Sequence, residues 1–220
     1  RQHYDRPTPS ELVQAGDHGV TLEYLRGMSG HGYRVGRLGA LVEMRDHGVT
    51  PDYIEELARY GVRDIPPREI VELRDHGVTP DYVGQLRRLG YPGLGTRAMI
   101  ELRDHGVTAD YVETLARNGI RDIPPSELTR MRDHGVMPEF VAALRTSGYG
   151  RFGTDDIVRL RDHGVDGPYV AALGSLGYTG LSADEIVRLR DHGVDPEFIR
   201  RVTDRERFTP EELVRLRTGG

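Results

Sequence analysis

The sequence repeats an Asp-His pair that could support proton-transfer or metal chemistry. The pentapeptide Arg74-Asp75-His76-Gly77-Val78, called here the RDHGV motif, recurs almost unchanged along the chain. A His beside a carboxylate can act as a general base, and both residues can bind zinc. The Asp of the motif stands at Asp17, Asp46, Asp75, Asp104, Asp133, Asp162 and Asp191, always 29 residues apart. So regular a spacing is typical of a repeat architecture.

The surrounding residues argue against chemistry at this pair. No Ser or Cys nucleophile recurs beside it, and catalysis needs one assembled site instead of several separated copies. A zinc site needs three or four converging ligands, whereas one Asp-His pair per repeat is spread along an axis. The sequence has no Cys, no HExxH, no Walker phosphate loop and no GxGxxG after a strand. We therefore expect a protein that is not an enzyme, with no catalytic, cofactor-binding or metal residues.

Each repeat contains two helix signals, which residues 66–94 illustrate. In the first helix Pro66 suits the opening turn, and Gly77 suits a left-handed residue just after the end. In the second helix Thr79 is expected as N-cap with Pro80 at the first helical position, and Gly90 ends the helix. Isolated helices of this length are marginal in water, so stacking of neighbouring repeats must stabilise them.

The same plan recurs along the chain and predicts the fold. First helices are expected near residues 8–18, 37–47, 66–76, 95–105, 124–134, 153–163, 182–192 and 209–217, and second helices near residues 21–31, 50–60, 79–89, 108–118, 137–147, 166–176 and 195–205. The sequence predicts an all-α, right-handed α-solenoid of seven 29-residue two-helix repeats plus a terminal capping helix. We expect one array over residues 1–220.

An aromatic residue recurs in the second of the two helices of each repeat. Because Phe substitutes for Tyr twice, we interpret the position as a flat core residue whose hydroxyl is not required. The set is Tyr24, Tyr53, Tyr82, Tyr111, Phe140, Tyr169 and Phe198.

The ends of the array suggest how the motif is used. Arg is missing only from the first repeat, at Gly16, and Asp only from the last, at Thr218. This offset predicts a structural ladder in which the Asp of one repeat pairs with the Arg of the next. The expected pairs are Asp17 with Arg45, Asp46 with Arg74, Asp75 with Arg103, Asp104 with Arg132, Asp133 with Arg161, Asp162 with Arg190, and Asp191 with Arg217.

The His of the motif is expected to cap the first helix of its own repeat. A His beside the final Gly can bind free carbonyl groups and, when protonated, oppose the helix dipole. The predicted capping residues are His18, His47, His76, His105, His134, His163 and His192. A weak acid-sensing role through these residues is an alternative.

Composition limits the partners. The formal charge of −5, and acids such as Asp52 and Asp81 in the GVTP turns, argue against nucleic-acid binding, which we keep as a lower alternative. No apolar run is long enough for a membrane helix and no signal-peptide pattern is present. The chain begins at Arg1 and not at Met, which is compatible with a processed product or a fragment.

The repeats resemble a bacterial family. The stretches at residues 73–91 and 181–198, LRDHGVTPDYVGQLRRLGY and LSADEIVRLRDHGVDPEF, are similar to tandem repeats of bacterial proteins without known function. Similar repeats are appended to membrane metallopeptidases of the beta-lactam-sensor type. The resemblance implies a bacterial origin and, for the membrane-linked relatives, an extracytoplasmic tail. It carries over no catalytic residue, because the peptidase part is missing.

These observations favour a scaffold that binds a protein or peptide along an extended surface. Specificity would then lie at variable positions of the second helices, namely Glu55, Glu56, Gln85, Glu113 and Thr114, and in the turns between repeats at Arg63, Asp64, Pro92, Arg121, Asp122 and Arg151. The alternatives are that these positions are merely solvated, or that the protein assembles with itself into a fibre.

Overall fold

The chain forms two compact units of stacked helices. The computed structural model describes residues 7–33, 38–203 and 207–219, and within these ranges it contains helices and no strand. One unit comprises Arg1–Ala109 and the other Asp110–Gly220, so the division falls at the first residue of a helix, α8. The all-α repeat fold is confirmed. The right-handed sense and the single array over residues 1–220 stay predictions.

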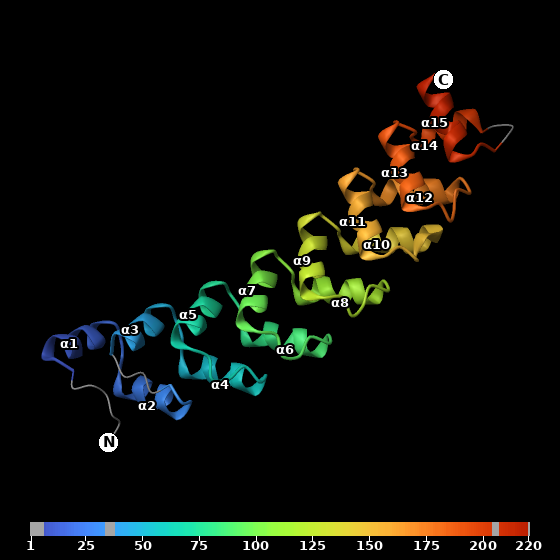
Figure 1. The fold of residues 1–220 in the computed structure, drawn as a ribbon. Helices are drawn as coiled ribbons and strands as arrows, with labels where there is room; N and C mark the ends of the chain where they lie inside the picture. Colours follow the sequence, from blue (N-terminus) through green and yellow to red (C-terminus); the bar gives the residue numbers. More distant parts are fainter. Residues whose placement is uncertain (1–6, 34–37, 204–206, 220) are drawn as a thin grey trace. The chain divides into compact units, whose positions relative to one another are not determined.

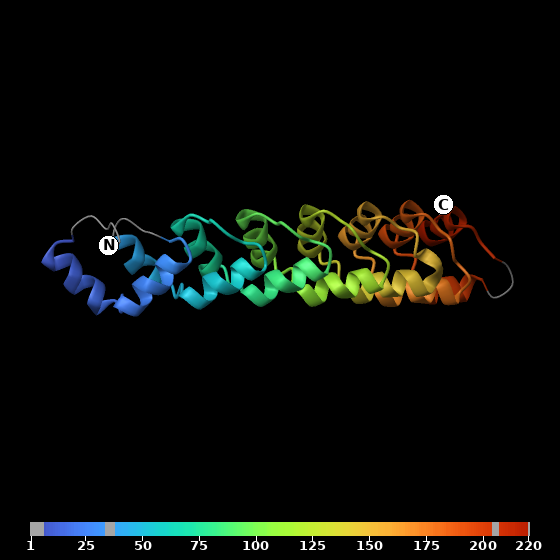
Figure 2. The same cartoon turned by 90° about the horizontal axis from the view of Figure 1, so that it is seen from below.

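In the first unit, helices of the same type pack on one another from repeat to repeat. The first helices are α1 (Pro9–Asp17), α3 (Leu38–Asp46), α5 (Pro67–Asp75) and α7 (Thr96–Asp104), and the second helices are α2 (Leu22–Gly30), α4 (Pro51–Arg59) and α6 (Pro80–Arg88). Helix α3 packs against α1 and α5, and α4 packs against α2 and α6. The helices therefore form two rows, which are visible from two sides in Figures 1 and 2.

The second unit repeats this arrangement. Its first helices are α9 (Pro125–Asp133), α11 (Thr154–Asp162), α13 (Ala183–Asp191) and α15 (Pro210–Thr218), and its second helices are α8 (Ala109–Arg117), α10 (Pro138–Leu144), α12 (Gly167–Ser175) and α14 (Pro196–Val202). Helix α11 packs against α9 and α13, and α12 packs against α10 and α14.

The helices lie where the sequence predicts them, generally one residue shorter at each end. Two second helices differ. Helix α10 stops at Leu144 and continues as a π-helical turn, η1 (Arg145–Tyr149), which contains Gly148 at φ 91°. Helix α14 ends at Val202, and part of its predicted range lies outside the described residues.

Local chemistry explains the helix boundaries. The Thr79 hydroxyl accepts a hydrogen bond from the Tyr82 backbone N–H, and Pro80 stands at the first helical position, as predicted. Gly77 is left-handed with φ 68°, and the Val78 N–H donates to the carbonyl of Leu73 at 2.9 Å. This six-to-one hydrogen bond closes a Schellman motif at the end of the first helix, which only a residue tolerant of positive φ can form cheaply.

The core lies between neighbouring repeats. In the third repeat Ile70, Leu73 and Leu86 are at most 1% exposed, whereas Leu89, at the end of the second helix, is only half-buried. The recurring aromatic residues are buried at every described position, which confirms their interpretation as core residues. Because each helix is short, most of its apolar face is covered by the adjacent repeats.

Candidate functional site

The Arg of each RDHGV motif lies over the aromatic ring of the preceding repeat. Guanidinium carbons and ring centres are 5.0–5.4 Å apart in Arg45–Tyr24, Arg74–Tyr53, Arg103–Tyr82, Arg132–Tyr111, Arg161–Phe140, Arg190–Tyr169 and Arg217–Phe198. A cation over an aromatic face is attracted by the negative potential of the ring. The motif therefore joins two repeats through this stack.

The tyrosine hydroxyl adds a second link in the same direction. Tyr82 donates from its hydroxyl to the carbonyl of Val107, the last residue of the next motif, at 2.7 Å. Equivalent hydrogen bonds join Tyr24 to Val49, Tyr53 to Val78, Tyr111 to Val136 and Tyr169 to Val194. Sequence reasoning missed this role of the hydroxyl, because Phe stands at the same position in two repeats.

The repeat that contains Phe140 shows how the hydroxyl is replaced. The carbonyl of Val165 accepts a hydrogen bond from the Arg161 guanidinium at 2.8 Å. The same Arg lies over the Phe140 ring and donates to the carbonyl of Gly135 at 3.2 Å. The buried carbonyl therefore keeps a donor, as buried polar groups generally do.

The His and Asp of the motif also link neighbouring repeats. The Nδ1 atom of His76 lies 2.6 Å from a carboxylate oxygen of Asp104, the Asp of the next motif. The same contact, at 2.6–3.0 Å, joins His18 to Asp46, His47 to Asp75, His134 to Asp162 and His163 to Asp191. His76 and Asp104 keep 42% and 45% of their side-chain surfaces exposed, so one such pair contributes little to stability.

The predicted pairing of Asp with the Arg of the next repeat is wrong for five of the seven expected pairs. Among the described residues no such ion pair joins Asp17 to Arg45, Asp46 to Arg74, Asp75 to Arg103, Asp162 to Arg190, or Asp191 to Arg217. In the middle of this set, Asp75 binds His47 of the preceding repeat while Arg103 lies over Tyr82.

The helix geometry explains why the Arg meets the aromatic ring while the Asp meets the His. Arg103 and Asp104 are consecutive, so their side chains leave the helix about 100° apart. Arg103 is directed to the buried ring of Tyr82 and Asp104 to the exposed His76. In every later repeat the Arg follows both an aromatic residue and an Asp of the preceding repeat, so the same offset fits either partner. The offset at the ends of the array therefore could not distinguish the two arrangements.

The His residues of the motif stand at the ends of their helices, as predicted, but five of their side chains bind the Asp of the next motif and not the carbonyl groups of their own helix. His18, His76, His105, His134, His163 and His192 are the C-cap residues of their helices, and the His47 N–H donates to the carbonyl of Glu43 at 3.1 Å. Where Thr218 replaces the next Asp, the His side chain lies against its own helix. There the Nδ1 of His192 is 3.0 Å from the Arg188 carbonyl.

Two kinds of pKa shift follow from these contacts. Burial raises the pKa of Tyr24, Tyr53, Tyr82 and Tyr111 to about 12, although the nearby Arg acts in the opposite direction. These phenols stay neutral hydrogen-bond donors at physiological pH. The hydrogen bond to Asp75 raises the pKa of His47 above its ordinary value, with smaller contributions from nearby carboxylates.

The described residues contain no candidate metal-binding cluster. Within residues 7–33, 38–203 and 207–219 no three His, Cys, Asp or Glu side chains gather around one point. None of the helices in these ranges combines the length and apolarity that crossing a membrane requires. The motif residues, in contrast, are occupied by contacts between neighbouring repeats.

The predicted partner surface lies on the outside of the second helices. Glu55, Glu56 and Glu113 are exposed, whereas Gln85 and Thr114 are half-buried. Ion pairs of 2.6 Å within one helix join Glu55 to Arg59 and Glu113 to Arg117. The amide of Gln85 donates to Asp81 at 2.8 Å. Glu55, Gln85 and Glu113 therefore bind residues of their own helices.

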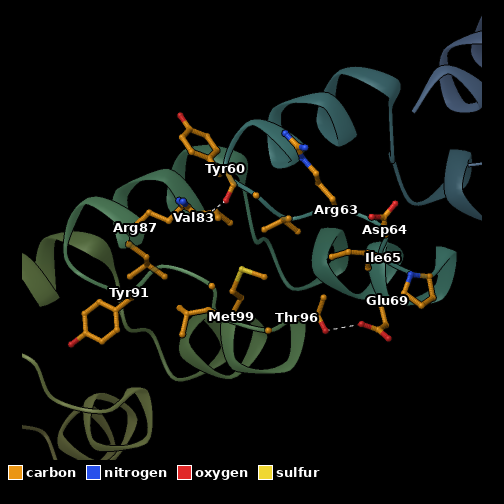
Figure 3. Close-up of a pocket in the computed structure, with 17 residues that line it drawn as sticks. Tyr60, Arg63, Asp64, Ile65, Glu69, Val83, Arg87, Tyr91, Thr96 and Met99 are labelled. Atoms are coloured by element: carbon orange, nitrogen blue, oxygen red, sulfur yellow. Dashed lines mark hydrogen bonds between the residues drawn. The ribbon is translucent and has the colours of Figure 1, made fainter. Parts of the chain in front are cut away.

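A pocket of about 360 Å³ opens in the first unit beside these helices. It lies between the turn after α4, the end of α6 and the start of α7, as Figure 3 shows. Val83, Leu86 and Met99 form a buried apolar floor, and Ile65 and Leu94 are half-buried beside it. Its charged lining includes Arg63 and Asp64, two of the turn residues that the sequence singled out, together with Glu69 and Arg87.

Comparison with known proteins adds no family. No protein-family model matches the chain, and no curated protein is significantly similar to it.

Proposed function

We propose that the chain is a non-enzymatic repeat scaffold that binds a protein or peptide segment along the outside of its stacked helices. The partner would lie across several second helices and the turns that follow them. Stacked helical repeats provide such surfaces because each repeat presents the same face in turn.

One observation supports this function above the others. Most of the polar residues that recur from repeat to repeat are engaged in contacts between repeats, as Arg103 is with Tyr82 and His76 with Asp104. The residues that vary between repeats lie outside, at positions such as Glu55 and Glu56, and around the pocket of the first unit. A scaffold needs this division, because constant residues maintain the stack while variable residues meet the partner.

Selection from a random peptide library tests the proposal. The full chain is immobilised and incubated with peptides of about 12 residues displayed on phage, a length that spans several repeats when extended. We expect a shared sequence pattern among the retained peptides, and competition between the free peptides for the chain. Retention that is no better than on urea-unfolded chain would contradict the proposed function.

A second candidate function, self-assembly through the ends of the stack, is supported by exposed apolar side chains. Leu12 and Val13 in α1 are 55% and 64% exposed, whereas the equivalent Leu41 and Val42 of the next repeat are 0% and 8% exposed. In the other unit Leu216 of α15 is 49% exposed. In the middle of a stack such residues are covered by another repeat, so a second copy could cover them here.

Sedimentation at several protein concentrations tests this second function. Self-assembly predicts an average mass that rises with concentration, and a smaller rise when Leu12 and Val13 are both replaced by Gln. A single monomeric species over the whole range would exclude assembly.

A further inference from the structure

One turn position carries a carboxylate in an unfavourable backbone conformation. Asp64 has φ 54°, and Asp122, 58 residues later, has φ 55°. At the equivalent position of two other repeats stand Gly93 and Gly180, with φ 75° and 76°. Gly adopts this left-handed conformation at little cost, whereas other residues adopt it rarely, Asp and Asn somewhat more readily. Gly therefore meets the needs of the turn, and the Asp64 carboxylate is not required by the backbone.

The Asp64 carboxylate lies exposed at the edge of the pocket in the first unit. No hydrogen bond or ion pair to it is made by any residue that the structure describes. Glu69 lies on the same side of the pocket, where it accepts a hydrogen bond from the Thr96 hydroxyl at 2.7 Å (Figure 3). Two carboxylates therefore lie on this side of the pocket, with Arg63 next to Asp64 in the chain.

The two cations of the pocket lining are held by the protein itself. Arg63 donates through Nε to the carbonyl of Ala58 at 3.0 Å, and Arg87 donates to the carbonyl of Tyr60 at 2.8 Å. Neither forms an ion pair with Asp64 or Glu69 among the described residues. These hydrogen bonds to neutral carbonyls fix the positions of both guanidinium groups but leave their charge, whereas the Asp64 carboxylate accepts no hydrogen bond from a described residue and can meet a ligand.

The second unit shows that a larger side chain fits the position of Leu94. The equivalent residue there, 58 residues later, is Phe152, which stacks on Tyr149 with ring centres 5.7 Å apart. Phe152 is 8% exposed and Tyr149 is 1% exposed, so both rings are packed into the protein. In the first unit Leu94 and Tyr91 are only half-buried and the pocket is open beside them.

We infer that this pocket anchors an extended basic and apolar peptide segment, with one apolar side chain over Val83 and Met99 and a neighbouring Lys or Arg beside Asp64. A volume of about 360 Å³ is at the lower end of ligand pockets and suits a side chain better than a large cofactor. The inference rests on the proposed scaffold function and names the chemistry of its partner.

The substitutions that test the inference come from the chain's own repeats. Asp64→Gly removes the carboxylate and relieves the backbone, as at Gly93. Leu94→Phe introduces the larger side chain that Phe152 provides at the equivalent position of the second unit, and should reduce the space beside Val83 and Met99. Asp122→Gly is the matched control, because it makes the same change in the same kind of turn away from the pocket. Thermal melting checks that all three variants are folded, and fluorescence polarisation measures their binding of peptides from the library selection.

We expect the selected peptides to share an apolar residue next to Lys or Arg. Asp64→Gly should weaken their binding about twofold to fivefold, as the loss of one exposed charge contact does, and less so at high salt. Leu94→Phe should weaken it about tenfold, because the anchor side chain loses its place. Asp122→Gly should leave affinity unchanged.

Three other outcomes overturn the inference, and they are distinguishable. If selected peptides bind Asp64→Gly and Leu94→Phe as tightly as the original chain, the pocket is not the anchor, although the scaffold function stands. The same holds if the selected peptides are acidic. If no peptide is selected at all, the proposed function fails together with the inference.

Discussion

Replacing Tyr82 by Phe isolates the hydrogen bond that links one repeat to the next. The substitution removes only the hydroxyl, which donates to the Val107 carbonyl at 2.7 Å from a side chain that is 5% exposed. A buried hydrogen bond contributes about 1 kcal/mol net, and a buried carbonyl left without a donor costs about 1–3 kcal/mol. The repeat around Phe140 indicates that the smaller of these two energies applies, because Arg161 supplies the missing donor to the carbonyl there.

We therefore expect Tyr82→Phe alone to reduce the free energy of unfolding by about 1 kcal/mol, because Arg103 above the ring can turn to the carbonyl. In a chain that also carries Arg103→Met no such donor remains, and the same substitution should cost about 2 kcal/mol. Urea denaturation followed by circular dichroism measures both values. Amide exchange in α6 and α7 locates the loss, since each repeat contacts only its neighbours.

Two results would refute this reasoning. If Tyr82→Phe is neutral in both backgrounds, the hydroxyl contributes nothing to the joint. If its cost is equal with and without Arg103, the Arg does not replace the donor, and the comparison with Phe140 does not transfer to this repeat.

Two further predictions concern close packing and pH. Gly174→Ala should destabilise the chain by about 1–3 kcal/mol, because the new Cβ would lie 3.1 Å from the Ser147 carbonyl oxygen. Gly16→Ala, at the same position of its helix, is the control: nothing lies within 4 Å of its new Cβ, so it should stabilise the chain by about 0.5–1 kcal/mol. Urea denaturation measures both values. The raised pKa of His47 means that its pair with Asp75 stabilises the fold fully below the unfolded pKa of about 6.5 and loses this effect as pH rises through the folded pKa. The difference in melting temperature between the original chain and Asp75→Asn should therefore shrink from pH about 6 to about 9, and a constant difference would show that the pair is not linked to proton binding.

Much of the fold could be predicted, because local signals mark each helix separately. Thr79, Pro80 and Gly77 determine where helices start and stop, and their recurrence extends the prediction to the whole chain. The π-helical turn after Leu144 could not be foreseen, since Gly148 occupies the same position as the Gly residues that end the other second helices.

The contacts between repeats could be predicted only in part. The spacing shows that neighbours must meet, and the ends of the array show that their contacts are offset by one repeat. Which side chains meet depends on the direction in which each leaves its helix, and consecutive residues such as Arg103 and Asp104 leave in different directions. The order of residue types along the chain does not reveal these directions, so the sequence predicts the wrong partner for Asp.

The pocket could not be predicted from the sequence, because equivalent residues of two repeats are packed differently. Residues 92–94 and 150–152 occupy the same place in their repeats, but Phe152 is packed inside while Leu94 remains half-buried beside an open pocket. Asp64 and Asp122 were recognisable as variable turn residues. Their left-handed conformation, which makes the carboxylate noteworthy, is visible only in the structure.

The RDHGV motif joins neighbouring repeats through an Arg that lies over the preceding aromatic ring, as Arg103 lies over Tyr82. A double-mutant cycle at Arg103 tests this most directly, by combining Arg103→Met with Tyr82→Leu in one cycle and with Asp75→Asn in another. We predict a coupling energy of about 0.5–1.5 kcal/mol with Tyr82 and a value below about 0.5 kcal/mol with Asp75. A larger coupling of Arg103 to Asp75 than to Tyr82 would contradict the account.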